Sequence, residues 1–397
     1  MHMRALKTSL VVVTLCLVAV AAASAESPQT ADNFPADLRL FLPETIYAAP
    51  GVEMNVYLDN VALILNPANY AFDVACKKGA QQAERWTLTP ADKDAGTYPF
   101  TLEVRDQGNR VVARAQSSLK VAPQTSGAGE SISALLIGDS LTHASVYSQR
   151  LLDLCQGADN PALTLVGSHT PLKDAPHNRH EGYGGWTAKR FATHYTGTAR
   201  TGSHEGCGSP FLYENDDGKR KLDFARYCQD VNGGAVPDFI TIFLGCNDTF
   251  SATDETIEAR IDDMFHHMDT LIAMIREGAQ ETRIGLLAPV PPAATQDAFG
   301  ANYQSGQTRW QYKRNQQRVV ERMYESYSGR EGEGIWLLPA FVNLDCAHNF
   351  PQATAPWNAH TSLSVTRLNN GVHPAPEGYR QIGDSIYCWI KACLAAQ

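Results

Sequence analysis

The 397-residue sequence lacks the patterns that identify membrane-spanning, zinc-binding and nucleotide-binding proteins, and it has few positive charges. After residue 25 no apolar run reaches about 18 residues, the length that a membrane-spanning helix needs. It contains no Cys-x-x-Cys pair, which argues against a structural zinc site, and no Gly-x-x-x-x-Gly-Lys phosphate-binding loop. Positive charge is also scarce: 33 Lys and Arg stand against 42 Asp and Glu, a net charge of −9. This balance disfavours partners such as nucleic acid or anionic lipid.

The first 25 residues have the composition of a secretory signal peptide. Arg4 and Lys7 supply the positive start, and an apolar run follows from Leu10 to Ala22. Small residues, Ala23-Ser24-Ala25, then provide a cleavage site. We therefore expect a secreted or periplasmic protein, processed near Ala25 and without a membrane anchor.

Cysteine and histidine give few further constraints. Of the nine cysteines, eight follow the predicted signal peptide, and an even number in an exported chain permits disulfides. Cys207 and Cys228 bracket an insertion and are the pair that we expect to be bridged. His177 and His180 have a metal-like spacing but no paired carboxylate or third ligand, so we predict neither a metal nor a cofactor.

The rest of the chain changes character near residue 130. Residues 35–122 contain short strands separated by turns, which predicts a small all-β, Ig-like sandwich domain. Residues 123–132 are rich in Pro, Gly and Ser and are typical of a linker. From residue 133 to the end, strands alternate with helical patterns, which predicts a parallel sheet covered on both faces. The expected strands are 134–138, 163–167, 239–244, 284–289 and 335–338, and the expected helices are 146–155, 256–277, 308–328 and 376–394.

Polar motifs occur where several of these elements end. Gly138-Asp139-Ser140-Leu141 follows the first strand of the α/β region, and Gly245-Cys246-Asn247-Asp248 follows a very apolar strand. A glycine-rich stretch, residues 181–187, precedes a helix, and Gly371-Val372-His373-Pro374 precedes the last helix. Because α/β proteins place reactive groups outside the carboxyl ends of their strands, these motifs are candidates for one site.

With these four motifs in this order, residues 133–395 resemble the SGNH/GDSL hydrolase family, which is named for Ser, Gly, Asn and His in four sequence blocks. The resemblance implies a flavodoxin-like three-layer α/β/α fold and ester hydrolysis. It implies that Ser140 is the nucleophile, that His373 is its base, and that Ser140, Gly185 and Asn247 form the oxyanion hole. This assignment suits the chemistry, since an imidazole can take the serine proton and amide donors can stabilise the oxyanion.

The sequence departs from the family three residues before the histidine, where Asn370 replaces the usual Asp. An asparagine carbonyl can accept the same hydrogen bond from the imidazole without a charge. Three possibilities stay open: Asn370 orients His373, a backbone carbonyl or another acid such as Asp345 or Asp384 does so, or the enzyme is slow or inactive.

The expected substrate follows from export and from aromatic residues near the site. Asp139, Trp186 and Trp310 are our candidate substrate-binding residues, and residues 297–314 are expected to form a polar, aromatic loop in which Arg309 could meet an anion. We therefore predict an esterase that removes O-acyl groups, most simply O-acetyl groups, from a carbohydrate or polysaccharide. The alternatives are a lipid or thioester acylhydrolase on the same fold and a non-catalytic glycan-binding protein. The sequence leaves the oligomeric state open.

Overall fold

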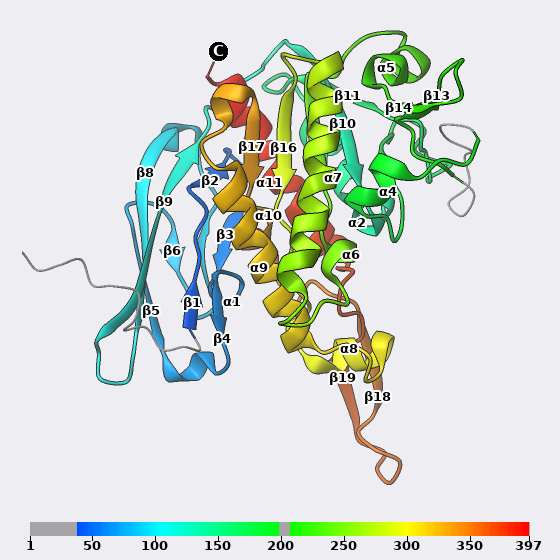
Figure 1. Cartoon of the computed structure of the whole chain (residues 1–397). Helices are drawn as coiled ribbons and strands as arrows, with labels where there is room; N and C mark the ends of the chain where they lie inside the picture. Colours follow the sequence, from blue (N-terminus) through cyan, green and yellow to red (C-terminus); the bar gives the residue numbers. More distant parts are fainter. Residues whose placement is uncertain (1–37, 198–206, 397) are drawn as a thin grey trace, which may run out of the picture. The chain divides into compact units, whose positions relative to one another are not determined.

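The computed structural model describes residues 38–197 and 207–396, so the predicted signal peptide lies outside the described residues. The α/β region is built on a parallel sheet in the order β11-β10-β15-β16-β17 (Figure 1). Numbered along the chain this is the order 2-1-3-4-5 of a flavodoxin-like sheet, as predicted. The strands are β10 (Ser131–Gly138), β11 (Ala162–Val166), β15 (Phe239–Phe243), β16 (Arg283–Leu287) and β17 (Ile335–Leu338), with β12 (Glu181–Gly182) paired to the end of β10.

Helices cover both faces of this sheet (Figure 1). Helices α7 and α9 lie in front of it in this view, whereas α11 lies behind it and packs against α3. The four predicted helices are confirmed to within one residue at either end, as α3 (Val146–Leu154), α7 (Ile257–Gly278), α9 (Arg309–Tyr327) and α11 (Pro376–Leu394). Shorter helices are α2 (Ser140–His143), α4 (Ala188–Thr193), α5 (Phe224–Asn232), α6 (Cys246–Thr249), α8 (Gln296–Tyr303) and α10 (Ala340–Asn343).

The β region before the sheet has two main layers. One sheet has the order β2-β9-β8-β5 and the other the order β3-β7-β6, with an additional β1-β4 pair. Trp86 and Phe100 meet between the layers with their ring centroids 5.2 Å apart, edge to face. The elements are β1 (Leu38–Leu40), β2 (Thr45–Ala48), β3 (Met54–Tyr57), α1 (Leu58–Val61), β4 (Ala62–Ile64), β5 (Ala71–Cys76), β6 (Ala80–Gln81), β7 (Arg85–Leu88), β8 (Gly96–Arg105) and β9 (Val111–Val121).

The β and α/β regions share one hydrophobic core and belong to one compact unit, Ala36–Gln397. Strands β2 and β9 contact α11, and β3 contacts α10. The connecting residues 122–130 are fixed by Lys391, whose buried ammonium group donates to the carbonyl oxygens of Gln124 (2.6 Å) and Ser126 (2.7 Å). The β region therefore lies against helices that also support the α/β sheet.

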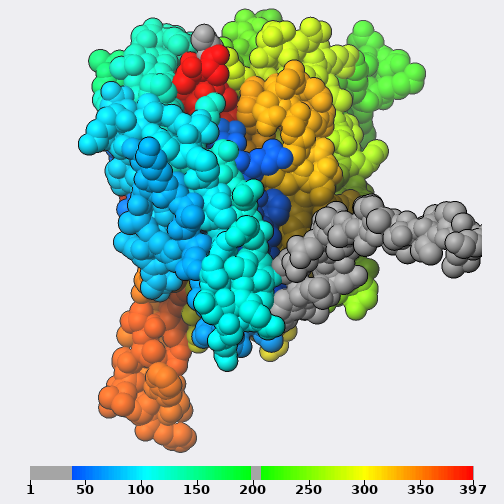
Figure 2. Space-filling view, turned by 90° about the vertical axis from the view of Figure 1, so that its left-hand side faces the viewer, coloured from blue at the N-terminus to red at the C-terminus, as the bar shows by residue number. Residues whose placement is uncertain are grey.

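Three features of the α/β region differ from the predictions. The expected loop 297–314 forms α8 and the first turn of α9 instead, because its aromatic residues pack inward and Phe299 and Tyr312 are buried. Strands β18 (Gln352–Pro356) and β19 (Ser364–Leu368) form a hairpin that projects from the surface (Figures 1 and 2, orange). A further hairpin consists of β13 (Leu212–Glu214) and β14 (Arg220–Leu222).

The structure also differs from the prediction of a disulfide. No disulfide joins any cysteines of the described residues, so the predicted Cys207–Cys228 bridge is not formed. Both side chains lie in the hydrophobic core, where a cysteine packs as a small apolar residue.

Candidate active site

Ser140 and His373 meet although 233 positions separate them in the sequence. Ser140 begins α2 directly after β10, and His373 lies in the loop that precedes α11. Serine Oγ and histidine Nε2 are 2.8 Å apart, and both residues are half-buried. A hydroxyl and an imidazole at this distance can exchange a proton.

The imidazole is suited to act as a base. Burial lowers the pKa of His373 below its ordinary value, so the ring is neutral near neutral pH. A neutral ring leaves Nε2 free to accept the serine proton, provided that the other nitrogen, Nδ1, carries the ring proton. Within the described ranges no hydrogen bond to Nδ1 is found.

Asn370 holds the histidine loop by its backbone. Its Oδ1 accepts hydrogen bonds from the backbone N–H groups of Val372 (3.1 Å) and His373 (2.9 Å). The expected hydrogen bond from the imidazole to the Asn370 carbonyl oxygen is not found, because the short side chain closes on its own loop as an Asx turn. Asn370 positions His373 without touching its ring.

The two acids considered as substitutes for the usual aspartate have other partners. The carboxylate of Asp384 accepts from Arg150 Nε at 2.7 Å. Asp345 accepts from Tyr57 Oη at 3.2 Å and lies 3.0 Å from the Nδ1 atom of His348. The structure thus places a Ser-His pair, rather than a Ser-His-acid triad, at the end of the sheet.

Gly185 lies in a tight turn beside Ser140. The turn is closed by Trp186 N–H donating to the Tyr183 carbonyl (3.1 Å), and Tyr183 N–H donates to the carbonyl of Gly138 at the end of β10 (3.0 Å). Gly185 has φ of +72°, which the third residue of a type II turn requires and which favours glycine. No acceptor is found among the described residues for the N–H groups of Ser140 and Gly185. Both donors can therefore serve an oxyanion.

Asn247 lies on α6, after the neighbouring strand β15, so β10 and β15 bring it close to Ser140. This pair of strands is the point at which the strand order reverses, where ligands bind in such sheets. The Asn247 side-chain amide donates to Asp139 Oδ2 and to the carbonyl of Trp186, both at 3.1 Å. Both amide N–H bonds are used inside the protein, so a substrate oxygen has to replace one of these acceptors.

Two carboxylates lie near this amide: Asp139 is buried, and Asp248, the next residue after Asn247, is half-buried with a buried Oδ2 atom. Asp139 is 1% exposed and accepts hydrogen bonds from Leu141 N–H and from the Cys246 thiol, both at 2.9 Å. Burial raises the pKa of Asp139 to about 6. Burial, with a smaller contribution from the charge of Asp139, raises the pKa of Asp248 to about 7. The direct substrate contact expected of Asp139 does not fit this burial, and its side chain positions Leu141 and Asn247 instead.

A comparison with known families decides the classification. The sequence profile described as GDSL-like Lipase/Acylhydrolase matches residues 135–386, well over half of the chain. The chain belongs to this family. It is accordingly a carboxylic ester hydrolase, and the matched residues include the Ser140, Gly185, Asn247 and His373 positions described above.

Two solved structures that are similar to part of this GDSL-like hydrolase are carbohydrate esterases. A family 3 carbohydrate esterase from Talaromyces cellulolyticus is 14% identical, and the match covers 67% of this chain and 99% of that one with a TM-score of 0.39. A family 3 carbohydrate esterase from Clostridium thermocellum is 16% identical over 65% of this chain and 94% of that one, with a TM-score of 0.35. No curated protein sequence matches the chain.

The sequence analysis missed one residue that supports the site of this hydrolase. Glu181, on β12, is fully buried, and its carboxylate accepts from the hydroxyls of Tyr183 and Tyr227. It also accepts from the backbone N–H of Ser168 (2.6 Å). Glu181 therefore anchors the start of the Gly185 turn. The sequence feature that could have revealed Glu181 is an acidic residue beside glycine and aromatic residues. A buried acid needs several hydrogen-bond donors, and neighbouring tyrosines can supply them.

The aromatic residues expected to bind substrate lie elsewhere. Trp186 is fully buried against Tyr183 and Phe191, so it cannot stack on a sugar ring. Trp310 lines a separate hollow of about 470 Å³ with Asp254 and other charged residues. The periodicity of α9 accounts for this placement, since the helix buries one face and turns Trp310 away from Ser140.

Two other polar residues singled out from the sequence also have structural partners. Arg309 donates to the carboxylate of Asp59 (2.8 Å) and to the Ala293 carbonyl (3.1 Å), so its guanidinium group is paired within the protein. His180 is fully buried, with Nε2 2.8 Å from Ser145 Oγ and Nδ1 accepting from Gly182 N–H at 3.0 Å. In the part of the chain that the structure describes, no group of three or more potential ligands could hold a metal ion.

Proposed function

We propose that this hydrolase is an exported serine esterase that removes O-acetyl groups from a carbohydrate through an acyl-enzyme on Ser140. The observation that carries the proposal is the 2.8 Å contact between Ser140 Oγ and His373 Nε2, next to the N–H groups of Ser140 and Gly185. The expected signal peptide is the basis for export.

The chemistry proceeds in two balanced halves. Ser140 Oγ forms a bond to the acyl carbon while its proton passes to Nε2 of His373, and the carbonyl oxygen becomes an oxyanion facing the amide donors. The bond from the acyl carbon to the alcohol oxygen then breaks, and the imidazolium proton passes to that oxygen. Water repeats the sequence on the acyl-enzyme and releases the carboxylic acid and Ser140.

The openness of the site supports a short acyl group on a large alcohol. Ser140 and His373 are half-buried and Gly185 is exposed, so a bulky substrate can approach them from solvent. Long acyl chains need an extended apolar wall, because each CH₂ group contributes about 0.8 kcal/mol only when it is buried away from water.

Among the described residues, no helix is long and apolar enough to cross a bilayer.

A screen of acetylated polysaccharides for released acetate tests the proposal. We expect acetate release by the native chain and none by Ser140→Ala, and faster hydrolysis of p-nitrophenyl acetate than of the palmitate ester. Preference for palmitate would indicate a lipid acylhydrolase. Glycan binding by the native chain without hydrolysis of any ester would indicate a non-catalytic glycan-binding protein.

A further inference from the structure

A hollow of about 510 Å³ lies where the β region meets the α/β region. The β region contributes residues of α1 and β4, Leu65 just after β4, and Phe72 of β5. The α/β region contributes Ala294, Arg309 and Cys346. A second hollow of about 290 Å³ adjoins it and shares Tyr57 and Asp345. We call the two together the interface groove. Its larger part alone has the size of a small-molecule site.

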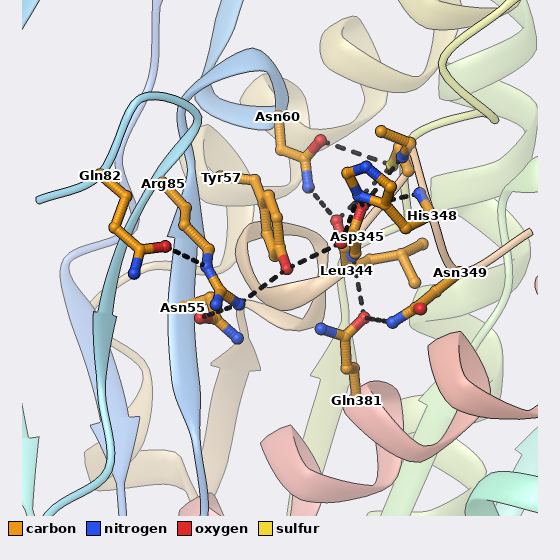
Figure 3. A network of polar contacts seen from close by, with 12 residues as sticks. Asn55, Tyr57, Asn60, Gln82, Arg85, Leu344, Asp345, His348, Asn349 and Gln381 are labelled. Carbon is orange, nitrogen blue, oxygen red and sulfur yellow. Dashed lines mark hydrogen bonds and ion pairs between the residues drawn. The ribbon is translucent and has the colours of Figure 1, made fainter.

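The walls of the interface groove are fixed by hydrogen bonds between the two regions. Tyr57 Oη donates to Asp345 and accepts from Arg85, and Asn60 Nδ2 donates to the carbonyls of Phe341 (2.8 Å) and Leu344 (2.7 Å). Figure 3 shows these side chains meeting from both regions. The groove is therefore a formed feature of one compact unit.

The interface groove shares a wall with the loop that carries His373. Ala293 N–H donates to the Gly371 carbonyl at 3.1 Å, two residues before the catalytic histidine. The next residue, Ala294, lines the groove and donates to the Cys346 carbonyl at 2.8 Å. The groove wall and the loop that carries His373 are therefore joined by backbone hydrogen bonds.

The lining combines flat apolar surfaces with fixed polar groups. Tyr70 and Phe72 are half-buried, and Leu65 is 69% exposed at the rim. Asp59 is held in the same wall by Arg309 (2.8 Å) and Lys313 (2.6 Å). Sugars need such a mixture, because their C–H faces pack on rings and their hydroxyls need hydrogen-bond partners. A long acyl chain would instead leave Asp59 and Arg309 facing hydrocarbon, which is unfavourable.

We propose that the interface groove binds the sugar chain of the ester substrate beyond the unit that carries the acetyl group. This inference rests on the proposed function and assigns the β region a part in substrate binding. It predicts that longer oligosaccharides are better substrates than acetylated monosaccharides, because only longer chains reach from Ser140 to Leu65 and Phe72.

The experiment obstructs the groove at its rim and uses a matched control. Leu65→Trp places a larger side chain at the rim of the groove. Leu363→Trp makes the same change at a residue that is 74% exposed and does not line the groove. The probes are p-nitrophenyl acetate and acetylated xylo- and manno-oligosaccharides of increasing length. The quantity compared is the ratio of kcat/KM for a long oligosaccharide to kcat/KM for p-nitrophenyl acetate. We expect Leu65→Trp to lower this ratio by about tenfold, mainly by raising KM for the oligosaccharide. Leu363→Trp should leave this ratio as in the native chain.

The outcomes separate the inference from the function on which it rests. If the native chain deacetylates the oligosaccharides but Leu65→Trp leaves the ratio and its length dependence unchanged, the groove is not the sugar site and the esterase assignment stands. If the native chain releases no acetate from any carbohydrate probe, the proposed function fails and the inference fails with it. Equal loss in both tryptophan variants would also overturn the inference.

Discussion

The proposed nucleophile, Ser140, and the proposed base, His373, are held by different means. Ser140 follows a buried strand, and buried groups that are hydrogen-bonded through side chains, above all Asp139 and Glu181, fix its surroundings. His373 lies on a loop held by Asn370 and by the Ala293–Gly371 backbone bond, with no acid beside its ring in the described residues. The comparison shows that a Ser-His pair can be assembled when one residue is surrounded by buried hydrogen-bonded groups and the other is positioned through its backbone.

The largest effect should come from the pair itself. We expect Ser140→Ala and His373→Ala each to lower kcat by about 10⁴-fold or more, because neither group can act without the other. The double variant should be no slower than the worse single variant, since residues that act as a unit are not additive. Steady-state rates with p-nitrophenyl acetate provide the measurement. Additive losses would show that the two side chains do not function together.

Glu181→Gln tests the buried support on the nucleophile side. In the native protein the carboxylate accepts hydrogen bonds from several donors, and the glutamine NH₂ would place a donor against those donors. We therefore expect a loss of roughly 2–4 kcal/mol in the free energy of unfolding. A displaced Gly185 turn should lower kcat by about 100-fold. Tyr227→Phe removes one donor, at 2.7 Å, and should show a smaller loss of the same kind if the glutamine variant does not fold.

The exposed Glu214→Gln serves as the control for that experiment, because it makes the same chemical change on the surface. Thermal unfolding and kcat are measured for all three variants. Native kcat in a folded Glu181→Gln protein would mean that the turn does not depend on this carboxylate.

Substitutions of Asn370 test the base side, where a smaller effect is expected. Asn370→Ala removes two hydrogen bonds to the loop backbone, worth about 1 kcal/mol each, and should lower kcat/KM by about tenfold. Asn370→Asp keeps both acceptors and should retain activity. Its negative charge should also raise the pKa of His373 and move the acid limb of kcat/KM upward.

The native acid limb should lie below the ordinary histidine pKa of about 6.5, because burial lowers the pKa of His373 and only the neutral ring accepts the proton. A pH profile of kcat/KM from native chain, Asn370→Ala and Asn370→Asp supplies the measurement. A folded but inactive Asn370→Asp protein would contradict the backbone-positioning role.

The same contrast explains what the sequence could predict. The strand before Ser140 and the helix after His373 follow from apolar runs and helical periodicity, whereas the roles expected of the two residues come from the resemblance of four motifs to the SGNH/GDSL family. Whether a polar side chain faces solvent does not follow from such patterns. Trp186 and Asp139 are buried because of what packs on them from distant elements, and Asn370 turned to its own backbone. The β18–β19 hairpin consists mostly of exposed residues, so its sequence resembles that of a loop.

The smallest effect concerns the acids that flank Asn247. Burial raises the pKa of Asp248 to about 7, and its Oδ2 atom is buried without a hydrogen-bond partner in the described structure. The folded protein therefore retains a proton that the unfolded chain releases above about pH 4, so this group makes the free energy of unfolding fall as the pH rises from about 4 to about 7.

Asp248→Asn should remove the fall in the free energy of unfolding between about pH 4 and about pH 7, because no charge is then buried. The amide oxygen can still accept from Ala188 N–H. We expect a gain of about 1–3 kcal/mol at pH 8, which disappears near pH 4. Thermal unfolding at both pH values provides the measurement, with the exposed Asp216→Asn as control. An equal gain at both pH values would show that packing rather than the buried charge is responsible.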